Sequence, residues 1–257
     1  MNVKTIKTND MNKKGILTIV MIAMLAMPME ARADGFSWDA GTKTLTVTGT
    51  DIAKDLAWPI AIGGTSVQKT DVDHLVIGSG VTSIGDGAFK KCTNLKTATL
   101  SNDVRSMGSS AFYGCTSLTT INFPQNEDFT RIQNSAFYDC TSLTTITLPN
   151  NVDIIGDYAF CGCSGLTSVD LGGVKEIGKQ AFYGCSSLPT ISLPTTLYLE
   201  KIGNNAFASC SSLQTVRTYY FNENNFGNRV FSSSMKGVII PSIITNITKA
   251  EIFATFP

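Results

Sequence analysis

The sequence predicts an α/β repeat protein, in which short parallel strands alternate with tight helical or 3₁₀ returns to build a solenoid. Two observations support this class. The dipeptide Ala-Phe recurs every 22 to 25 residues, followed by Cys three residues after the Phe and Leu three residues after the Cys. After the Leu, most copies alternate Thr or Ser with Ile or Val and end at Pro or Gly, a pattern typical of a strand and its exit turn. One unit of this length cannot bury both of its faces, so the units must stack.

The repeats are predicted over residues 81–235, as six full copies and one degenerate copy. The Phe of each full copy is Phe89, Phe112, Phe137, Phe160, Phe182 or Phe207, and Phe231 marks the weaker seventh. The matching Cys residues are Cys92, Cys115, Cys140, Cys163, Cys185 and Cys210. Five residues before the Phe stands an apolar residue that Gly usually follows, as in Ile155-Gly156. Apolar members three residues apart favour tight turns that point Ala, Phe, Cys and Leu inward.

Residues 1–33 have the three parts of a secretory signal peptide. Lys13 and Lys14 precede an apolar or small stretch from Gly15 to Met27, and Ala31-Arg32-Ala33 offers a cleavage site. Thirteen helical residues are too few to cross a bilayer, and a buried core helix is the alternative interpretation. The sequence therefore predicts cleavage near Ala33 and a secreted or cell-surface protein without a membrane span.

Residues 34–80 are predicted to form an N-terminal β cap and a partial first repeat. The segment from Phe36 to Gly49 alternates around an Ala-Gly turn, which is typical of a β-hairpin. Trp38 and Trp58 either pack on the first coil or offer a platform to a ligand. At the other end, residues 236–257 are predicted to form a C-terminal cap that begins with a further strand.

The frame Ile-Gly-x-x-Ala-Phe-x-x-Cys-x-x-Leu-x-x-Ile-x-Leu-Pro, complete from Ile177 to Pro194, resembles the BspA-like class of bacterial leucine-rich repeats. The resemblance covers about 160 of 257 residues. It implies a right-handed leucine-rich repeat solenoid with a parallel β-sheet on its concave face. It also implies a family of largely secreted or cell-surface proteins that bind host or matrix proteins. Ala98, Gln133 and Ser234 depart from the frame and suggest capping of the ends.

The cysteines are predicted to be free buried thiols. Six of the seven occupy one repeated interior slot, where Cys acts as a small hydrophobic residue. A zinc site is excluded because its four ligands must converge on a point, whereas this slot spreads the sulfurs along a line. Cys161 occupies the position that holds Tyr in other copies. It is therefore either half-buried and inert or an exposed, reactive thiol.

Charge and composition argue against nucleic acid and against catalysis. Lys plus Arg equals Asp plus Glu, at 20 each, so there is no basic excess to neutralise a phosphate backbone. The single histidine, His74, alternates with apolar residues as a solvent-facing strand residue, and no second catalytic group accompanies it. Asp71 and Asp73 lack the further oxygen ligands that a metal needs. The sequence predicts no enzyme, no cofactor and no metal site.

The candidate binding site consists of the outward strand residues that flank the central apolar residue of each strand. These residues are Thr97, Thr99, Thr120, Asn122, Thr145, Thr147, Ser168, Asp170, Thr190, Ser192, Thr215 and Arg217. Such a hydroxylated face suits an extended protein partner, or it merely stabilises the sheet as a Thr ladder. Its lack of aromatic anchors disfavours a glycan. Tyr113, Tyr138 and Tyr183 form an alternative surface, or they pack half-buried.

These features favour a non-catalytic, adhesin-like binding protein that holds a protein partner, such as a host or extracellular matrix protein, on one solenoid face. Two alternatives remain. One is a structural or accessory subunit of a bacterial surface assembly, whose caps would carry the contacts. The other is a glycan-binding module.

Overall fold

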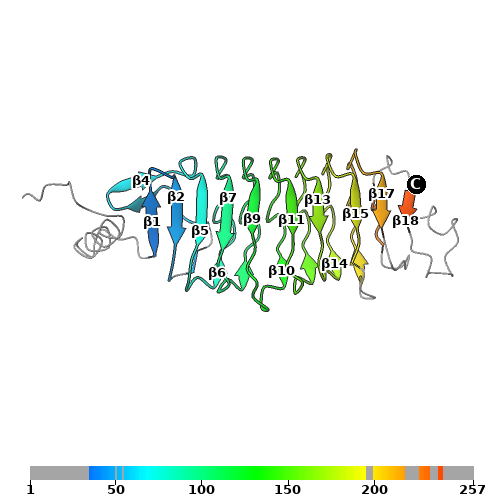
Figure 1. The fold of residues 1–257 in the computed structure, drawn as a ribbon, viewed down its shortest axis with the longest axis horizontal. Helices are drawn as coiled ribbons and strands as arrows, with labels where there is room; N and C mark the ends of the chain where they lie inside the picture. Colours follow the sequence, from blue (N-terminus) through cyan, green and yellow to red (C-terminus); the bar gives the residue numbers. More distant parts are fainter. Residues whose placement is uncertain are drawn as a thin grey trace, which may run out of the picture.

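The computed structural model describes residues 35–49, 51–53, 55–194, 199–217, 226–231 and 237–239. These residues form a β-solenoid whose coils stack in a single row along the long axis of the molecule (Figure 1). The predicted signal peptide over residues 1–33 lies outside the described residues. Of the predicted C-terminal cap over residues 236–257, only the strand at 237–239 is described.

The longer strands of successive coils lie side by side and form a strip along one side of the solenoid. In spatial order they are β1 (Phe36–Asp39), β2 (Thr44–Val47), β5 (His74–Ile77), β7 (Thr97–Leu100), β9 (Thr120–Asn122), β11 (Thr145–Thr147), β13 (Ser168–Asp170), β15 (Thr190–Ser192), β17 (Thr215–Arg217) and β18 (Gly237–Ile239). The predicted N-terminal hairpin is confirmed, since β1 pairs antiparallel with β2. The later pairs are parallel. Hydrogen bonding is interrupted between β9 and β11 and between β13 and β15, so the strip contains three sheets.

Two-residue strands form a second strip of parallel pairs. They are β6 (Ser83–Ile84), β8 (Ser106–Met107), β10 (Arg131–Ile132), β12 (Ile154–Ile155), β14 (Glu176–Ile177) and β16 (Lys201–Ile202). The second residue of each strand is buried, and Gly usually follows it. A Cβ atom on Gly178 would lie 2.6 Å from the backbone nitrogen of Asp157 in the preceding coil. Glycine therefore lets the coils approach closely at this corner.

The expected helical part of the α/β class is not found, because no helix lies among the described residues. Each return around Ala-Phe is a series of turns in which backbone N–H groups alternate between two acceptors. Around Phe137, three N–H groups donate to the next coil, those of Ser135, Phe137 and Asp139. The other three donate to the carbonyl three residues earlier, those of Ala136, Tyr138 and Cys140.

Left-handed backbone conformations explain why the returns are not helical. In every full copy, the residues two before and two after the Phe have positive φ, as at Ser135 (55°) and Asp139 (56°). A residue in this region interrupts a right-handed helix. The N–H groups of Ser135 and Asp139 themselves donate to the next coil, whereas those of the residues that follow them, Ala136 and Cys140, donate within their own turn. Apolar residues that recur every three positions in the sequence fit these separate turns as well as they fit a 3₁₀ helix.

A stack of phenylalanine rings runs through the core. The repeated Phe side chains from Phe89 to Phe231 follow one another with ring centroids 5.1 to 5.5 Å apart. The six rings from Phe89 to Phe207 are at most 1% exposed. The inward direction predicted for Ala, Phe, Cys and Leu is therefore confirmed in the six full copies.

At the N-terminal end of the solenoid, a side-chain group supplies the hydrogen bond that a preceding coil supplies elsewhere. In the later copies, the carbonyl of the Ala in each Ala-Phe pair accepts the N–H group of the Phe in the preceding coil. No coil with such a Phe precedes Ala88. The indole Nε1 of Trp58 donates to the Ala88 carbonyl instead, at 3.1 Å, and its ring meets Phe89 edge-on. Trp38 is also half-buried against the core. Both tryptophans therefore have the packing role that was one of the two expectations.

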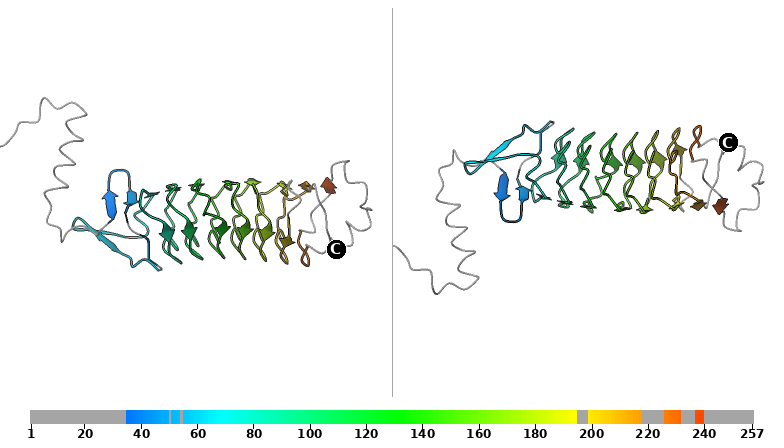
Figure 2. Two further views of the ribbon diagram at one scale, coloured as in Figure 1. Left: turned by 90° about the horizontal axis from the view of Figure 1, so that it is seen from below. Right: turned by 90° about the horizontal axis from the view of Figure 1, so that it is seen from above.

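A second hairpin lies at the same end. It consists of β3 (Ile60–Ile62) and β4 (Thr65–Val67), which pair antiparallel. Figure 2 shows this hairpin on the opposite side of the solenoid end from β1 and β2. The N-terminal edge of the long-strand strip is formed by β1, whose pairing partner among the described strands is β2.

Candidate functional site

The structure places the twelve predicted strand residues on one face of the solenoid, in two parallel rows. Strand register fixes the rows, because Thr145 pairs with Ser168 while Thr147 pairs with Asp170. The first row is Thr97, Thr120, Thr145, Ser168, Thr190 and Thr215, and the second is Thr99, Asn122, Thr147, Asp170, Ser192 and Arg217. Three of the first row are half-buried, namely Thr97, Thr190 and Thr215, and the other nine are exposed. We call this surface the long-strand face.

The long-strand face extends further toward the N-terminus than the sequence analysis proposed. Thr44 and His74 continue the first row, and Thr46 and Val76 continue the second. His74 is half-buried, and its Nδ1 lies 2.8 Å from the hydroxyl oxygen of Thr97. The Thr-Leu-Thr alternation of the hairpin was the signal that could have assigned Thr44 and Thr46 to the same surface.

Hydroxyl groups on the long-strand face differ from those just before it in the chain. The Thr119 and Thr167 hydroxyls each donate to a backbone carbonyl of the preceding coil, both at 3.0 Å. Those two side chains therefore help to stack the coils. The hydroxyls of Thr120, Thr145 and Thr147 make no hydrogen bond within the described structure. Their donors and acceptors are free for a partner.

Charge is sparse on the long-strand face and gathers at its C-terminal end. Asp170 and Arg217 are its charged members among the twelve predicted residues, and both are exposed. Thr97 through Ser168 in the first row carry no charge at all. Within the described ranges, no group of three His, Cys, Asp or Glu side chains could hold a metal ion. The face therefore offers hydrogen bonds and shape rather than a reactive centre.

The alternative tyrosine surface is only partly continuous. Tyr113 and Tyr138 stack with ring centroids 4.8 Å apart, and the Lys90 ammonium lies 4.8 Å from the Tyr113 centroid. Both tyrosines are half-buried, whereas Tyr183 is 36% exposed. Cys161 occupies the place between Tyr138 and Tyr183 and breaks the row. The structure thus brings two of the three tyrosines into contact.

Cys161 is buried, which contradicts the exposed-thiol alternative. Its side chain is 6% exposed, because the coils on either side enclose this corner of the return. Burial raises the pKa of the Cys161 thiol, although a hydrogen bond with the Tyr138 side chain opposes part of the shift. A thiol that is both shielded and harder to ionise is a poor nucleophile.

All seven cysteines are free and buried, as predicted for the repeated slot. The structure adds a function that the sequence analysis missed. Each thiol from Cys115 to Cys210 in that slot donates to the Phe carbonyl of the preceding coil, with sulfur–oxygen distances of 3.1 to 3.3 Å. Burial raises the pKa of Cys92 to about 12 and that of Cys163 further still. We call the six cysteines of the repeated slot the thiol ladder; they are Cys92, Cys115, Cys140, Cys163, Cys185 and Cys210.

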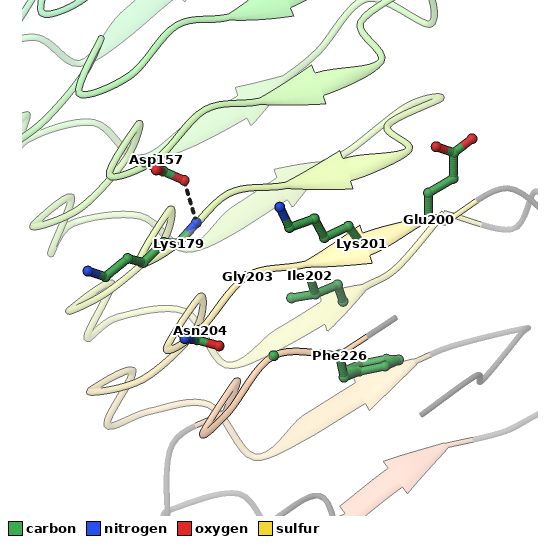
Figure 3. Close-up of a pocket in the computed structure, with 9 residues that line it drawn as sticks. Asp157, Lys179, Glu200, Lys201, Ile202, Gly203, Asn204 and Phe226 are labelled. Carbon is green, nitrogen blue, oxygen red and sulfur yellow. Dashed lines mark hydrogen bonds between the residues drawn. The ribbon is translucent and has the colours of Figure 1, made fainter. Parts of the chain in front are cut away.

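An open groove lies over the last described coils, on the side of the short strands (Figure 3). It measures about 470 Å³ and contains Lys179, Glu200 and Lys201. Figure 3 shows these three side chains projecting separately rather than toward one point. The oxygens of Asp157 and Asn204 in this groove already accept backbone N–H groups of the next coil, at 2.7 and 2.8 Å. The groove therefore has no convergent set of catalytic or ligating groups.

The fold and the face together define a class: a bacterial-type leucine-rich repeat solenoid that presents a polar strand face and, in its described residues, no catalytic constellation. The chain belongs to the family described as the BspA type leucine rich repeat region. Six copies of that repeat match over residues 61–173 and 130–255. The resemblance drawn from the sequence is therefore confirmed.

Among solved structures similar to this chain, one supports the fold. A leucine-rich repeat protein from T. pallidum is 24% identical, with a TM-score of 0.57, and the match covers 85% of this chain and 92% of that one. A leucine-rich cell surface protein from Faecalibacterium prausnitzii A2-165 is 20% identical, with a TM-score of 0.45 and coverage of 83% and 77%. No curated protein sequence matches the chain. No helix in the described part of the chain is long and apolar enough to cross a membrane.

Proposed function

We propose that this chain is a non-catalytic binding protein, secreted or displayed at the bacterial surface, that holds a protein partner on its long-strand face. The observation that carries the proposal is the unused hydrogen-bonding capacity of that face. Thr120, Thr145 and Thr147 expose hydroxyls with no partner, whereas the neighbouring Thr119 and Thr167 are occupied in stacking the coils. A Thr ladder stabilises a sheet in part through cross-strand hydrogen bonds between hydroxyls, and these three described residues make none.

An extended protein segment suits this arrangement. Polar groups on adjacent coils lie about 4.8 Å apart along the solenoid, and the two rows lie about 7 Å apart across it, so a segment running along the face meets polar groups at every coil. Most of the face is uncharged, so binding would rely on hydrogen bonds and close fit and would depend little on salt. The predicted leader and the family both support an extracellular partner, such as a host surface or matrix protein.

The glycan alternative is less well supported. Among its described residues, the long-strand face contains no Phe, Tyr or Trp. Sugar rings commonly stack on such side chains, which also dominate the affinity of many interfaces. A glycan array on which the protein bound no sugar would remove this alternative.

The test is a pull-down of host surface and extracellular matrix proteins with the secreted chain, compared with two double variants. Thr145→Arg with Thr147→Arg places two bulky cations at the centre of the long-strand face. Ser106→Arg with Thr130→Arg adds the same charge at exposed positions beside the short strands. The proposal expects a partner that the first variant loses and the control retains. Equal retention by both variants would contradict it, and so would the absence of any partner.

A further inference from the structure

Among the described strands, β1 lies at the N-terminal edge of the long-strand strip and pairs with β2 alone. The β3–β4 hairpin contacts β1 through β3 without pairing with it and extends on the other side of the solenoid end (Figure 2). An edge strand presents unpaired N–H and C=O groups that can pair with another strand. The question is which strand would fit here.

Hydrogen-bond alternation identifies the groups that point outward. The Thr48 N–H donates to the Gly35 carbonyl at 2.7 Å, so these two residues form a hydrogen-bonded antiparallel pair. Such pairs alternate along an antiparallel ladder. The next hydrogen-bonded pair is therefore Ser37 with Thr46. The N–H and C=O groups of Phe36 and Trp38 consequently face the open edge.

The same end of the solenoid is incompletely covered. Six partly buried apolar residues pack against the core, and five of them lie at this end: Phe36, Trp38, Leu56, Trp58 and Ile62. The Phe36 and Trp38 side chains are on the core side of β1, opposite Val47 and Leu45. A strand added at the edge would therefore need apolar side chains at the positions beside Phe36 and Trp38.

We propose that the open edge of β1 pairs with the β1 edge of a second copy of this chain. In an antiparallel pairing centred on Ser37, Phe36 lies opposite the partner's Trp38, and Ser37 lies opposite the partner's Ser37. This register uses all four outward backbone groups of Phe36 and Trp38. It sets aromatic side chains against each other on the core side, and it sets Asp39 opposite the partner's Gly35 rather than opposite a like charge. The strand is thus complementary to itself, as a twofold interface requires.

The pairing has a consequence for the whole assembly. The twofold axis passes through Ser37 perpendicular to the sheet, so both long-strand faces point to the same side. The two copies would present one extended surface, and a partner with two epitopes would bind through both. The pairing itself does not depend on the proposed function.

The test uses sedimentation equilibrium of the full chain, expressed with its own leader, over a wide concentration range. Wild-type protein is expected to associate reversibly to a dimer. Ser37→Lys places two ammonium groups opposite each other at the twofold axis and should weaken dimerisation at least tenfold. Ser37 is half-buried beside an open groove of about 650 Å³ that Thr46 also lines, so each folded subunit can accommodate a lysine. Thr46→Lys, one strand inward, is the matched control and should dimerise like wild type.

A cross-link provides the second measurement. In this register the two Ser37 residues form a non-hydrogen-bonded pair with Cα atoms about 4.5 Å apart, within the span of a disulfide. Ser37→Cys should therefore form a covalent dimer when oxidised glutathione accepts the two electrons and protons, while Thr46→Cys should not. The native cysteines are buried and do not interfere. A chain that stays monomeric at every concentration and gives no Ser37→Cys cross-link would overturn the proposal.

Discussion

In the thiol ladder, one residue type both packs in the core and donates hydrogen bonds to backbone carbonyls. Each Cys fills a small slot beside the phenylalanine stack, and from Cys115 onward its S–H group also donates to a carbonyl of the preceding coil. The Phe112 carbonyl, for example, accepts both the Cys115 N–H and the Cys140 thiol, each at 3.2 Å. Alanine would supply neither the volume nor the donor, which explains why the slot repeats as Cys.

Replacing one rung of the ladder should therefore destabilise the fold. Cys140→Ala removes a buried sulfur and its hydrogen bond, and we expect it to lower the free energy of unfolding by about 1–2 kcal/mol. Denaturant unfolding monitored by circular dichroism measures the change. Thr145→Ala, at an exposed hydroxyl without a partner, should change the same quantity by less than about 0.5 kcal/mol. Equal effects of the two substitutions would contradict the role given to the thiol.

Alkaline pH should destabilise the protein through the same residues. The thiol pKa is 9.0 before burial, and burial raises that of Cys92 to about 12. Below pH 9 the thiols are protonated in both states, so burial carries no ionisation penalty. Above pH 9 the unfolded chain gains thiolate charge that the folded core resists, so the free energy of unfolding falls as pH rises toward 12.

Thermal melts from pH 8 to pH 11 test this expectation. The melting temperature should decrease with pH, and Cys92→Ala should show a shallower decrease than wild type. Parallel slopes for the two proteins would show that Cys92 makes no contribution to the pH dependence.

At the scale of the structural element, the longer strands were predictable and the returns were not. Thr145 to Thr147 alternates polar and apolar residues, and that pattern belongs to a half-buried strand. The strands of the second strip, such as Glu176–Ile177, are two residues long and carry no alternation that could reveal them. Their pairing arises only when the coils stack.

The returns were expected to be helical because apolar residues three apart fit a tight helical turn. What the spacing could not show is the left-handed backbone at residues such as Ser135 and Tyr158, neither of them glycine. The candidate face followed directly from strand alternation, whereas its extension to His74 depended on the β2–β5 register. The partners of the Cys thiols also required the coil-to-coil alignment.

The stability of the N-terminal end depends on the Trp58 side chain. Trp58→Phe keeps the edge-on contact with Phe89 but removes the Nε1 donor to the Ala88 carbonyl. We expect a loss of about 1–3 kcal/mol in the free energy of unfolding, because the carbonyl of the buried Ala88 loses its partner. Hydrogen exchange should localise the change to the first coils. Uniform acceleration of exchange along the whole solenoid would contradict a local capping role.

At the scale of the whole molecule, the solenoid separates stability from binding. Phenylalanine rings and thiols fill the interior, and side chains such as Thr119 bond one coil to the next. On the long-strand face, the hydroxyls of Thr120, Thr145 and Thr147 have no hydrogen-bond partner among the described residues. Because each coil contacts mainly its neighbours, substitutions on this face should alter recognition without unfolding the protein.

The most direct test of the account is a titration of the captured partner against wild type, the Thr145→Arg/Thr147→Arg variant and Tyr183→Ala. The account predicts that the arginine variant binds at least tenfold more weakly, at unchanged melting temperature, while Tyr183→Ala binds like wild type. Weakened binding by Tyr183→Ala together with full affinity of the arginine variant would contradict the account and assign recognition to the tyrosine surface.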